Sequence, residues 1–155
     1  IFVLENNGYA ETTSSSWAIG GGNPVERAKG FGLPGVSVDG FDFFAVHEAA
    51  KEAVERARAG DGPSFIETRL SRYYGHFEGD SQTYRGKDEV KEIRESVDAL
   101  SQFREKVIGA ALIESDDLDS IDNEVAEVIE NSVSKAKASP LPTSEDLLTD
   151  VYVSY

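Results

Sequence analysis

The chain has 155 residues, which is enough for one domain with a hydrophobic core. Its 29 acidic residues outnumber its 15 basic ones and give a formal net charge of -14. This excess argues against nucleic acid as a partner, because phosphate contacts need clustered Lys and Arg, and it argues against an anionic membrane surface.

Three further features of the composition bear on where the protein works. Cysteine is absent, which excludes a disulfide framework and a thiolate metal site. The sequence has no apolar run of membrane-spanning length and no visible signal peptide, so we expect a cytoplasmic protein. Methionine is also absent, and the first residues already have the pattern of an apolar strand. We therefore expect a fragment whose N-terminal part is missing.

The first stretch of the chain is apolar and then turns polar. Ile1 to Leu4 predicts a buried strand, and Asn6-Asn7-Gly8 predicts the turn that ends it. Ligands of α/β proteins bind at the carboxyl ends of parallel strands, and Mg²⁺ accepts neutral amide oxygens. The alternative is an ordinary turn, since Asn-Gly is common in turns.

A loop and a short helix follow this strand. Residues 10–23 are rich in Ser, Thr and Gly and predict a loop. Trp17 lies within the loop, where it is either a packing anchor or part of an interface. Asn23 is expected to cap a short helix with Pro24 in its first turn.

The middle of the chain alternates between strand and helix patterns. Residues 36–38 and 64–70 predict strands, and between them Asp42 is expected to cap a helix over 43–59 that ends at Gly60. The predicted inward stripe of that helix is Phe43, Val46, Ala50, Ala53, Val54 and Ala57. The alternation predicts an α/β fold with a parallel sheet flanked by helices.

The last part of the chain predicts helices and a tail. Helices are expected over 87–95, 99–109 and 115–138, with an extended tail after Pro140. In the longest helix, Ser115 is the expected cap and the predicted inward residues are Leu118, Ile121, Val125, Val128 and Val133. We therefore expect two parts, an α/β domain over 1–86 and helices with a tail over 87–155.

Two predicted loops carry residues suited to binding a ligand. Asn7 and nearby backbone carbonyls offer oxygens for a hard cation. Residues 72–85 have no helical or strand periodicity, and there Arg72 and His76 offer donors for a phosphate or a developing oxyanion. Because both loops follow strands of a parallel sheet, they are expected at one edge, where they would hold a diphosphate through Mg²⁺.

Several linked motifs resemble one enzyme family. They are Glu5-Asn6-Asn7-Gly8-Tyr9, Val38-Asp39-Gly40, the run from Glu48 to Arg58, and Arg72-Tyr73-Tyr74-Gly75-His76. In this order they resemble the α subunit of thiamine-diphosphate-dependent 2-oxo acid dehydrogenase E1 components, from residue 1 to about residue 152. Residues 71–85 and 14–18 are most similar to the acetoin dehydrogenase branch.

The resemblance implies part of a thiamine-diphosphate-binding fold, with thiamine diphosphate and Mg²⁺ as cofactors, and it covers the C-terminal half of the subunit. It implies that Asn7 binds Mg²⁺ through its side chain and Tyr9 through its backbone carbonyl. A third ligand would come from a Gly-Asp-Gly motif upstream of residue 1. Arg72 would order a mobile loop near the diphosphate. His76 would be catalytic, either stabilising charge on substrate-derived intermediates or assisting transfer to the lipoyl group.

The function implied by the resemblance is that of an oxidoreductase acting on a small molecule. The parent subunit would cleave acetoin and pass the acetyl group to a lipoyl-bearing E2 component. Its E1 β subunit, in an α2β2 assembly, would supply the catalytic Glu, so the fragment alone is expected to be inactive. The alternatives are a pyruvate or branched-chain 2-oxo acid dehydrogenase, or a fragment that acts only as a subunit-interaction module without cofactor.

Overall fold

The computed structural model describes residues 1–153. It separates into two compact units, Ile1–Ala110 and a second that begins at Ala111, and each is described by itself. Ser154 and Tyr155, at the end of the predicted tail, lie outside the described residues. The division after residue 86 stays a prediction, since the first unit also contains helices that follow it.

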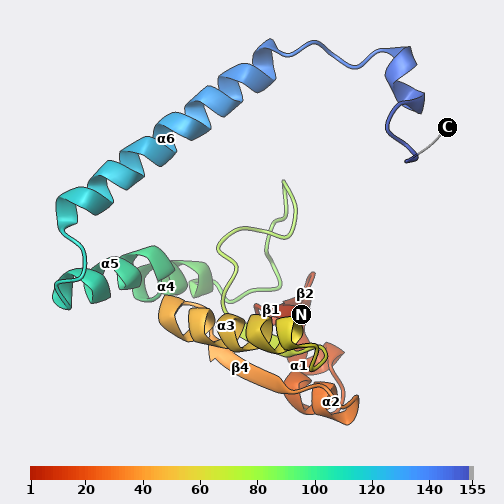
Figure 1. Ribbon diagram of the computed structural model, residues 1–155, viewed down its shortest axis with the longest axis vertical. Coiled ribbons are helices and arrows are strands. Elements are labelled where there is room, and N and C mark those ends of the chain that lie inside the picture. Colours follow the sequence, from red (N-terminus) through yellow and green to blue (C-terminus); the bar gives the residue numbers. More distant parts are fainter. Residues whose placement is uncertain (154–155) are drawn as a thin grey trace. The chain divides into compact units, whose positions relative to one another are not determined.

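A three-stranded parallel sheet organises the first unit (Figure 1). Its strands are β1 (Phe2–Asn6), β4 (Gly35–Asp39) and β5 (Phe65–Arg69), in the order β1-β5-β4. Phe65 in the central strand is in register with Phe2 on one side and Gly35 on the other. The predicted α/β fold with a parallel sheet is thus confirmed, and all three strands end at the same edge.

Helices cover both faces of this sheet. On one face, Ala49 and Ala53 of α3 (Phe43–Ala59) pack on Ile66, with Val38 beside them. Because side chains alternate along a strand, Gly35 faces the opposite side from Val38. There Val25 of α2 (Pro24–Gly30) lies so near that a Cβ on Gly35 would be 3.0 Å from its Cγ1.

The ends of α2 and α3 follow their local sequence. The Asn23 side chain accepts from the Val25 N–H at 2.8 Å, and Asp42 Oδ1 accepts from the Phe44 N–H at 3.1 Å. Gly60 ends α3 in the left-handed conformation, with φ +80°. All three predicted caps are confirmed. Asp42 also accepts from Lys106 Nζ at 2.7 Å, and this hydrogen bond is the main cause that lowers the pKa of Asp42.

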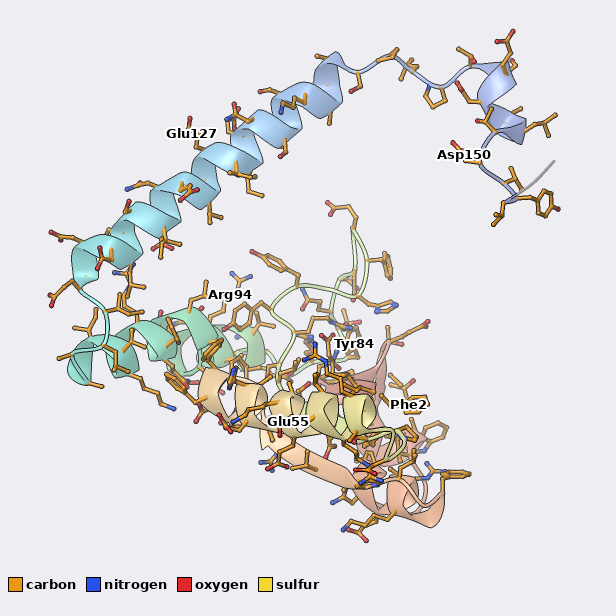
Figure 2. The ribbon with its side chains drawn as sticks, viewed as in Figure 1. Phe2, Glu55, Tyr84, Arg94, Glu127 and Asp150 are labelled. Atoms are coloured by element: carbon orange, nitrogen blue, oxygen red, sulfur yellow. The ribbon has the colours of Figure 1, made fainter. Side chains whose placement is uncertain are left out.

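In the first unit, two predictions of burial are wrong. The first strand was expected to be buried, but Phe2 is 57% exposed and Val3 61%, because β1 is an edge strand (Figure 2). In α3, Ala53 is buried as predicted, but Phe43 is 51% exposed and Ala57 is also exposed. The narrow sheet covers the middle of this helix and leaves both ends open.

The segment predicted as one loop after β1 contains short regular elements. Strands β2 (Tyr9–Ala10) and β3 (Thr13–Ser14) form a small antiparallel hairpin, and α1 (Ser15–Ala18) is a single helical turn. Trp17 is 82% exposed, so it is not a packing anchor within the described part of the chain. The loop after β5, drawn in light green in Figure 1, has no helix or strand over residues 72–85, as predicted.

The rest of the chain up to residue 153 contains four helical elements: α4 (Glu89–Ser96), α5 (Ala99–Gly109), α6 (Ser115–Ala138) and the short 3-10 helix η1 (Ser144–Leu148). In the second unit α6 has its predicted bounds, but Glu114 rather than Ser115 is its N-cap residue. Of its predicted inward residues Leu118 is buried. The others are 40–56% exposed, and they are Ile121, Val125, Val128 and Val133.

The predicted extended tail is partly helical. The Thr143 N–H donates to the Asp146 carboxylate at 2.6 Å and the Thr143 side chain accepts from the Asp146 N–H, which closes a capping box at the start of η1. The Thr143 hydroxyl also donates to the Asp146 carboxylate at 2.9 Å. Across residues 1–153, no helix combines the length and the apolar character that crossing a membrane requires.

Candidate functional site

The turn after β1 is built by its own side chains. Asn6 Oδ1 accepts from the Gly8 N–H at 3.2 Å, and Asn7 Oδ1 accepts from the Tyr9 N–H at 3.0 Å. Gly8 has φ +82°, a conformation that side chains other than glycine's rarely adopt. The Gly8 carbonyl in turn accepts from the Ser15 N–H at 2.8 Å. The two asparagines therefore fix the backbone of the turn from both sides.

The turn is also tied to the central strand. Asn6 Nδ2 donates to Glu67 Oε1 at 2.7 Å, and Glu67 is only 4% exposed. The Leu70 N–H, just beyond the end of β5, donates to the Asn6 carbonyl at 3.1 Å. The end of β1 is thus held to β5 through both backbone and side chain.

Arg72 joins the loop after β5 to the loop after β1. Its Nη2 donates to the Tyr84 hydroxyl at 2.6 Å and to the Glu11 carbonyl at 3.4 Å, and its Nε donates to the Tyr74 carbonyl at 3.1 Å. Because Glu11 belongs to the hairpin after the first strand, this one guanidinium contacts both loops.

His76 lies beside Arg72 and is about half exposed. Its Nδ1 is 3.3 Å from Arg72 Nη1, and its Nε2 is 3.9 Å from Glu11 Oε1. A guanidinium can only donate, so this contact requires an acceptor at Nδ1 and leaves the imidazole proton on Nε2. The arrangement gives His76 an N–H donor on the side away from Arg72.

Asp80 closes the loop on itself. Its carboxylate accepts from the backbone N–H of His76 at 2.8 Å, from the Tyr84 hydroxyl at 2.7 Å and from the backbone N–H of Gln82 at 2.9 Å. These hydrogen bonds, the one from His76 first, lower the pKa of Asp80 to about 2. Gly75 packs so closely here that a Cβ on it would lie 2.5 Å from the Asp80 Cβ.

Tyr9 connects the turn to the start of α4. Its hydroxyl donates to the Glu89 carboxylate, at 2.9 Å from Oε2 and 3.1 Å from Oε1. Burial raises the pKa of Tyr9, and the hydrogen bond to Glu89 raises it further. The Arg85 guanidinium lies 5.3 Å from the Tyr9 ring centroid, and the Tyr84 ring meets the Tyr9 ring edge-on at the same distance. Figure 2 labels Tyr84, which lies in the loop between β5 and α4.

The four site residues predicted from the sequence fall into one connected group. Asn7 and Tyr9 share the turn, while Arg72 and His76 contact each other in the loop. Tyr84 joins the pairs, since it contacts both Tyr9 and Arg72. The structure therefore brings together all four predicted residues.

Three acidic residues of this group were not predicted: Glu11, Glu67 and Glu89. Glu67 could have been recognised from the sequence, because it is an acidic residue in the middle of a predicted strand, directly after Phe65 and Ile66. Glu89 could not be singled out, since it is one of three glutamates in a mostly polar helix. Glu11 lies in a loop whose composition points to no partner.

The metal ligands available on this chain fit part of a Mg²⁺ site. The side-chain oxygen of Asn7 and the carbonyl of Tyr9 are the neutral oxygens that Mg²⁺ accepts, and the Asn7 oxygen is already oriented by the Tyr9 N–H. Residues 1–153 contain no group of three or more His, Cys, Asp or Glu placed to hold a metal ion. A Mg²⁺ bound here would need further ligands from a cofactor, from water or from residues outside these loops.

Comparisons with known proteins relate the chain to one family. The family model described as dehydrogenase E1 component matches residues 1–145. The chain is 57% identical, over all of its 155 residues, to the α subunit of acetoin:2,6-dichlorophenolindophenol oxidoreductase from Cupriavidus necator, and it covers 46% of that protein. The subunit of the same name from Bacillus subtilis is 48% identical over the same 155 residues, with 46% covered.

A third relative has a different printed name. The chain is 39% identical over 151 residues to the pyruvate dehydrogenase E1 component subunit α from Rhizobium meliloti, which amounts to 97% of this chain and 43% of that protein. The chain thus spans a little under half the length of the curated relatives it matches.

Proposed function

Because the chain belongs to the dehydrogenase E1 component family, as its motifs predicted, we propose that it is part of the α subunit of a thiamine-diphosphate-dependent acetoin dehydrogenase. The proposal rests above all on the contact between the two loops, in which Arg72 bonds both Tyr84 and the Glu11 carbonyl. The contact supports the proposal because it joins the loop that carries the proposed oxygen ligands to the loop that carries the cationic donors, and binding a Mg²⁺ diphosphate requires both.

Each residue of the turn and the loop has a role in this proposal. Asn7 Oδ1 and the Tyr9 carbonyl hold Mg²⁺, and Arg72 donates toward the diphosphate. When bound, thiamine diphosphate supplies the nucleophilic carbon and the electron sink of the reaction. The residues of the turn and the loop would orient this cofactor.

His76 acts on the substrate side. With Nδ1 held by Arg72, its Nε2–H donates to the oxygen on which negative charge develops during cleavage of the substrate. The Glu11 carboxylate lies 3.9 Å from Nε2, so this edge of the ring has a polar surrounding. The other histidine, His47, is exposed on α3, where it contacts Glu48 and has no part in the site.

We propose acetoin as the substrate, because the names of two relatives that are 57% and 48% identical to the chain contain acetoin. Decarboxylation of pyruvate is the second candidate, favoured by the 39% identity to a pyruvate dehydrogenase subunit. In either case we propose a β subunit as the partner that completes the site and a lipoyl carrier as the acceptor of the acetyl group.

The experiment uses the full-length subunit assembled with its β partner. Titration with thiamine diphosphate and Mg²⁺ in a calorimeter is expected to give a binding signal, and turnover is expected with acetoin in preference to pyruvate. Asn7→Ala should weaken Mg²⁺-dependent binding at least tenfold. The matched variant Asn123→Ala, at an exposed position of α6, should bind as the unmodified protein does. A complex that gives no signal with thiamine diphosphate and Mg²⁺ would contradict the proposal.

A further inference from the structure

Glu67 is a buried acidic side chain that the proposed function does not use. It lies in the central strand β5 and is 4% exposed. Burying a carboxyl group is costly unless it is hydrogen-bonded, and here the bond comes from Asn6 Nδ2 at 2.7 Å. The contact joins residues 61 positions apart in the chain, so it depends on the fold and not on local sequence.

The sheet geometry explains why these two residues meet. Leu4 is in register with Glu67, and Asn6 follows two positions later in the same strand. Since alternate residues of a strand share a face, Leu4, Asn6 and Glu67 lie on one side of the sheet. Within the described chain β1 is paired along one edge, so this side-chain bond adds to the backbone ladder at its open end.

The hydrogen bond between Asn6 and Glu67 also constrains the turn after β1, because the same Asn6 side chain bonds to the turn. Its amide group is planar, so the bond from Nδ2 to Glu67 also sets the direction of Oδ1. Oδ1 accepts from the Gly8 N–H at 3.2 Å, and the next residue, Tyr9, is held in the same way by Asn7 at 3.0 Å. The chain of contacts therefore runs from Glu67 through Asn6 to the backbone that carries the two proposed metal ligands.

We infer that Glu67 is a positioning residue for the Mg²⁺-binding turn, acting through Asn6 and not as a ligand itself. This inference rests on the proposed function, because it takes Asn7 and Tyr9 as ligands. Residues that orient metal ligands through hydrogen bonds, without binding the metal themselves, commonly matter for affinity. Their removal changes metal affinity by about 10- to 100-fold. The acceptor oxygen at position 67, and not its charge, is the group that the contact requires.

The first test measures the Mg²⁺ concentration that half-saturates thiamine diphosphate binding, in the full subunit with its β partner. Glu67→Ala removes the acceptor and is expected to raise this concentration about tenfold. Glu67→Gln keeps an oxygen that can accept from Asn6, so it is expected to stay within about threefold of the unmodified protein. Equal values for all three proteins would overturn the inference.

Thr68→Val provides the matched control. The Thr68 hydroxyl also bonds across the same pair of strands, to the Leu4 carbonyl at 3.2 Å, and Thr68 is also buried. This variant should lower the melting temperature about as much as Glu67→Ala does, while it leaves the half-saturating Mg²⁺ concentration unchanged. If it weakens Mg²⁺ binding as much as Glu67→Ala does, the role of Glu67 is general stability and the inference is wrong.

A second readout does not involve the cofactor. Hydrogen exchange of the Gly8 and Tyr9 amides should quicken in Glu67→Ala and stay slow in Glu67→Gln, both measured without Mg²⁺ or thiamine diphosphate. Unchanged exchange in Glu67→Ala would overturn the inference even if the proposed function holds. Conversely, absent cofactor binding in the unmodified protein, together with quickened exchange in Glu67→Ala, would reject the proposed function and reduce Glu67 to a support of the turn.

Discussion

The Tyr9 hydroxyl donates a hydrogen bond to the Glu89 carboxylate across eighty positions of the chain. Glu89 Oε2 also accepts from the Gly86 N–H at 3.1 Å, so the same carboxylate fixes the end of the loop that begins after β5. Tyr9 follows the turn after β1 directly. One carboxylate therefore links the turn after β1 to the point where the second loop rejoins a helix.

This link should be measurable as a coupling energy. Tyr9→Phe and Glu89→Ala are each expected to lower the free energy of unfolding by about 1 kcal/mol, since each removes a partly buried hydrogen bond. In urea unfolding of both single variants and the double variant, the effects should fall short of additivity by about the same amount. Tyr74→Phe is the control, because Tyr74 is 74% exposed and should cost nothing measurable. Additive effects would contradict the link.

The loop should respond strongly to a small side chain at one glycine. Gly75→Ala would place a Cβ 2.5 Å from the Asp80 Cβ, so the loop must shift and give up some of the hydrogen bonds to Asp80. We expect faster trypsin cleavage after Arg72 and Arg85 in limited proteolysis. Gly20→Ala, where the added atom would meet nothing within 4 Å, should be cleaved at the rate of the unmodified protein. Equal rates for both variants would count against this packing.

The lowered pKa of Asp80 predicts that its carboxylate stabilises the fold less at acidic pH. Its pKa is about 2 in the folded chain against an ordinary value of 3.8, so the ionised form stabilises the fold. That contribution is complete above pH 3.8 and is lost as the pH falls toward 2. In chemical unfolding, Asp80→Asn should be less stable than the unmodified protein at pH 7, and the difference should shrink between about pH 4 and pH 2. A difference that is independent of pH would refute the assignment.

The two histidines should differ sharply in their effect on turnover. In the complex with the β subunit, His76→Asn is expected to lower kcat about 100-fold, because it removes the Nε2–H donor, while thiamine diphosphate binding changes little. His47→Asn should leave both quantities unchanged, since His47 lies exposed on α3. Steady-state kinetics and calorimetry on the same preparations check the prediction. A similar loss in both variants would exclude the proposed role of His76.

The exposed edge of the sheet predicts association of the isolated 155-residue chain. Ile1, Phe2 and Val3 are more than half exposed, and β1 offers an open strand edge within the described residues. Size exclusion with light scattering should give a mass above that of a monomer, and Val3→Lys should shift it toward the monomer. Asn123→Lys makes the same change of charge away from the edge and should not. A monomer before any substitution would contradict the prediction.

Much of the fold could be predicted because it follows from local chemistry. Asn23 and Asp42 are capping residues at helix starts, and Gly60 can adopt the left-handed conformation that ends a helix. The alternation of strands and helices predicted the parallel sheet, and that sheet in turn placed the two loops at one edge. The neighbouring positions of the loops that carry Arg72 and Asn7 could thus be predicted from the sequence.

Other features could not be predicted because they depend on what lies next to an element in space. Hydrophobic periodicity does not reveal how wide the sheet is. It therefore could not predict that Phe43, at the end of α3, is exposed. The bond between Tyr9 and Glu89 joins segments with no local pattern in common. The bond between Asn6 and Glu67 depends on strand register, which the sequence did not supply.

The exposed Trp17 also gives the protein an optical reporter. It is the chain's single tryptophan and is 82% exposed in the segment that follows the turn after β1. Its fluorescence should therefore show the long-wavelength emission of a water-exposed indole and strong quenching by acrylamide. Any molecule that covers this surface would shift the emission to the blue and protect it from the quencher, so assembly at this face can be followed without a label.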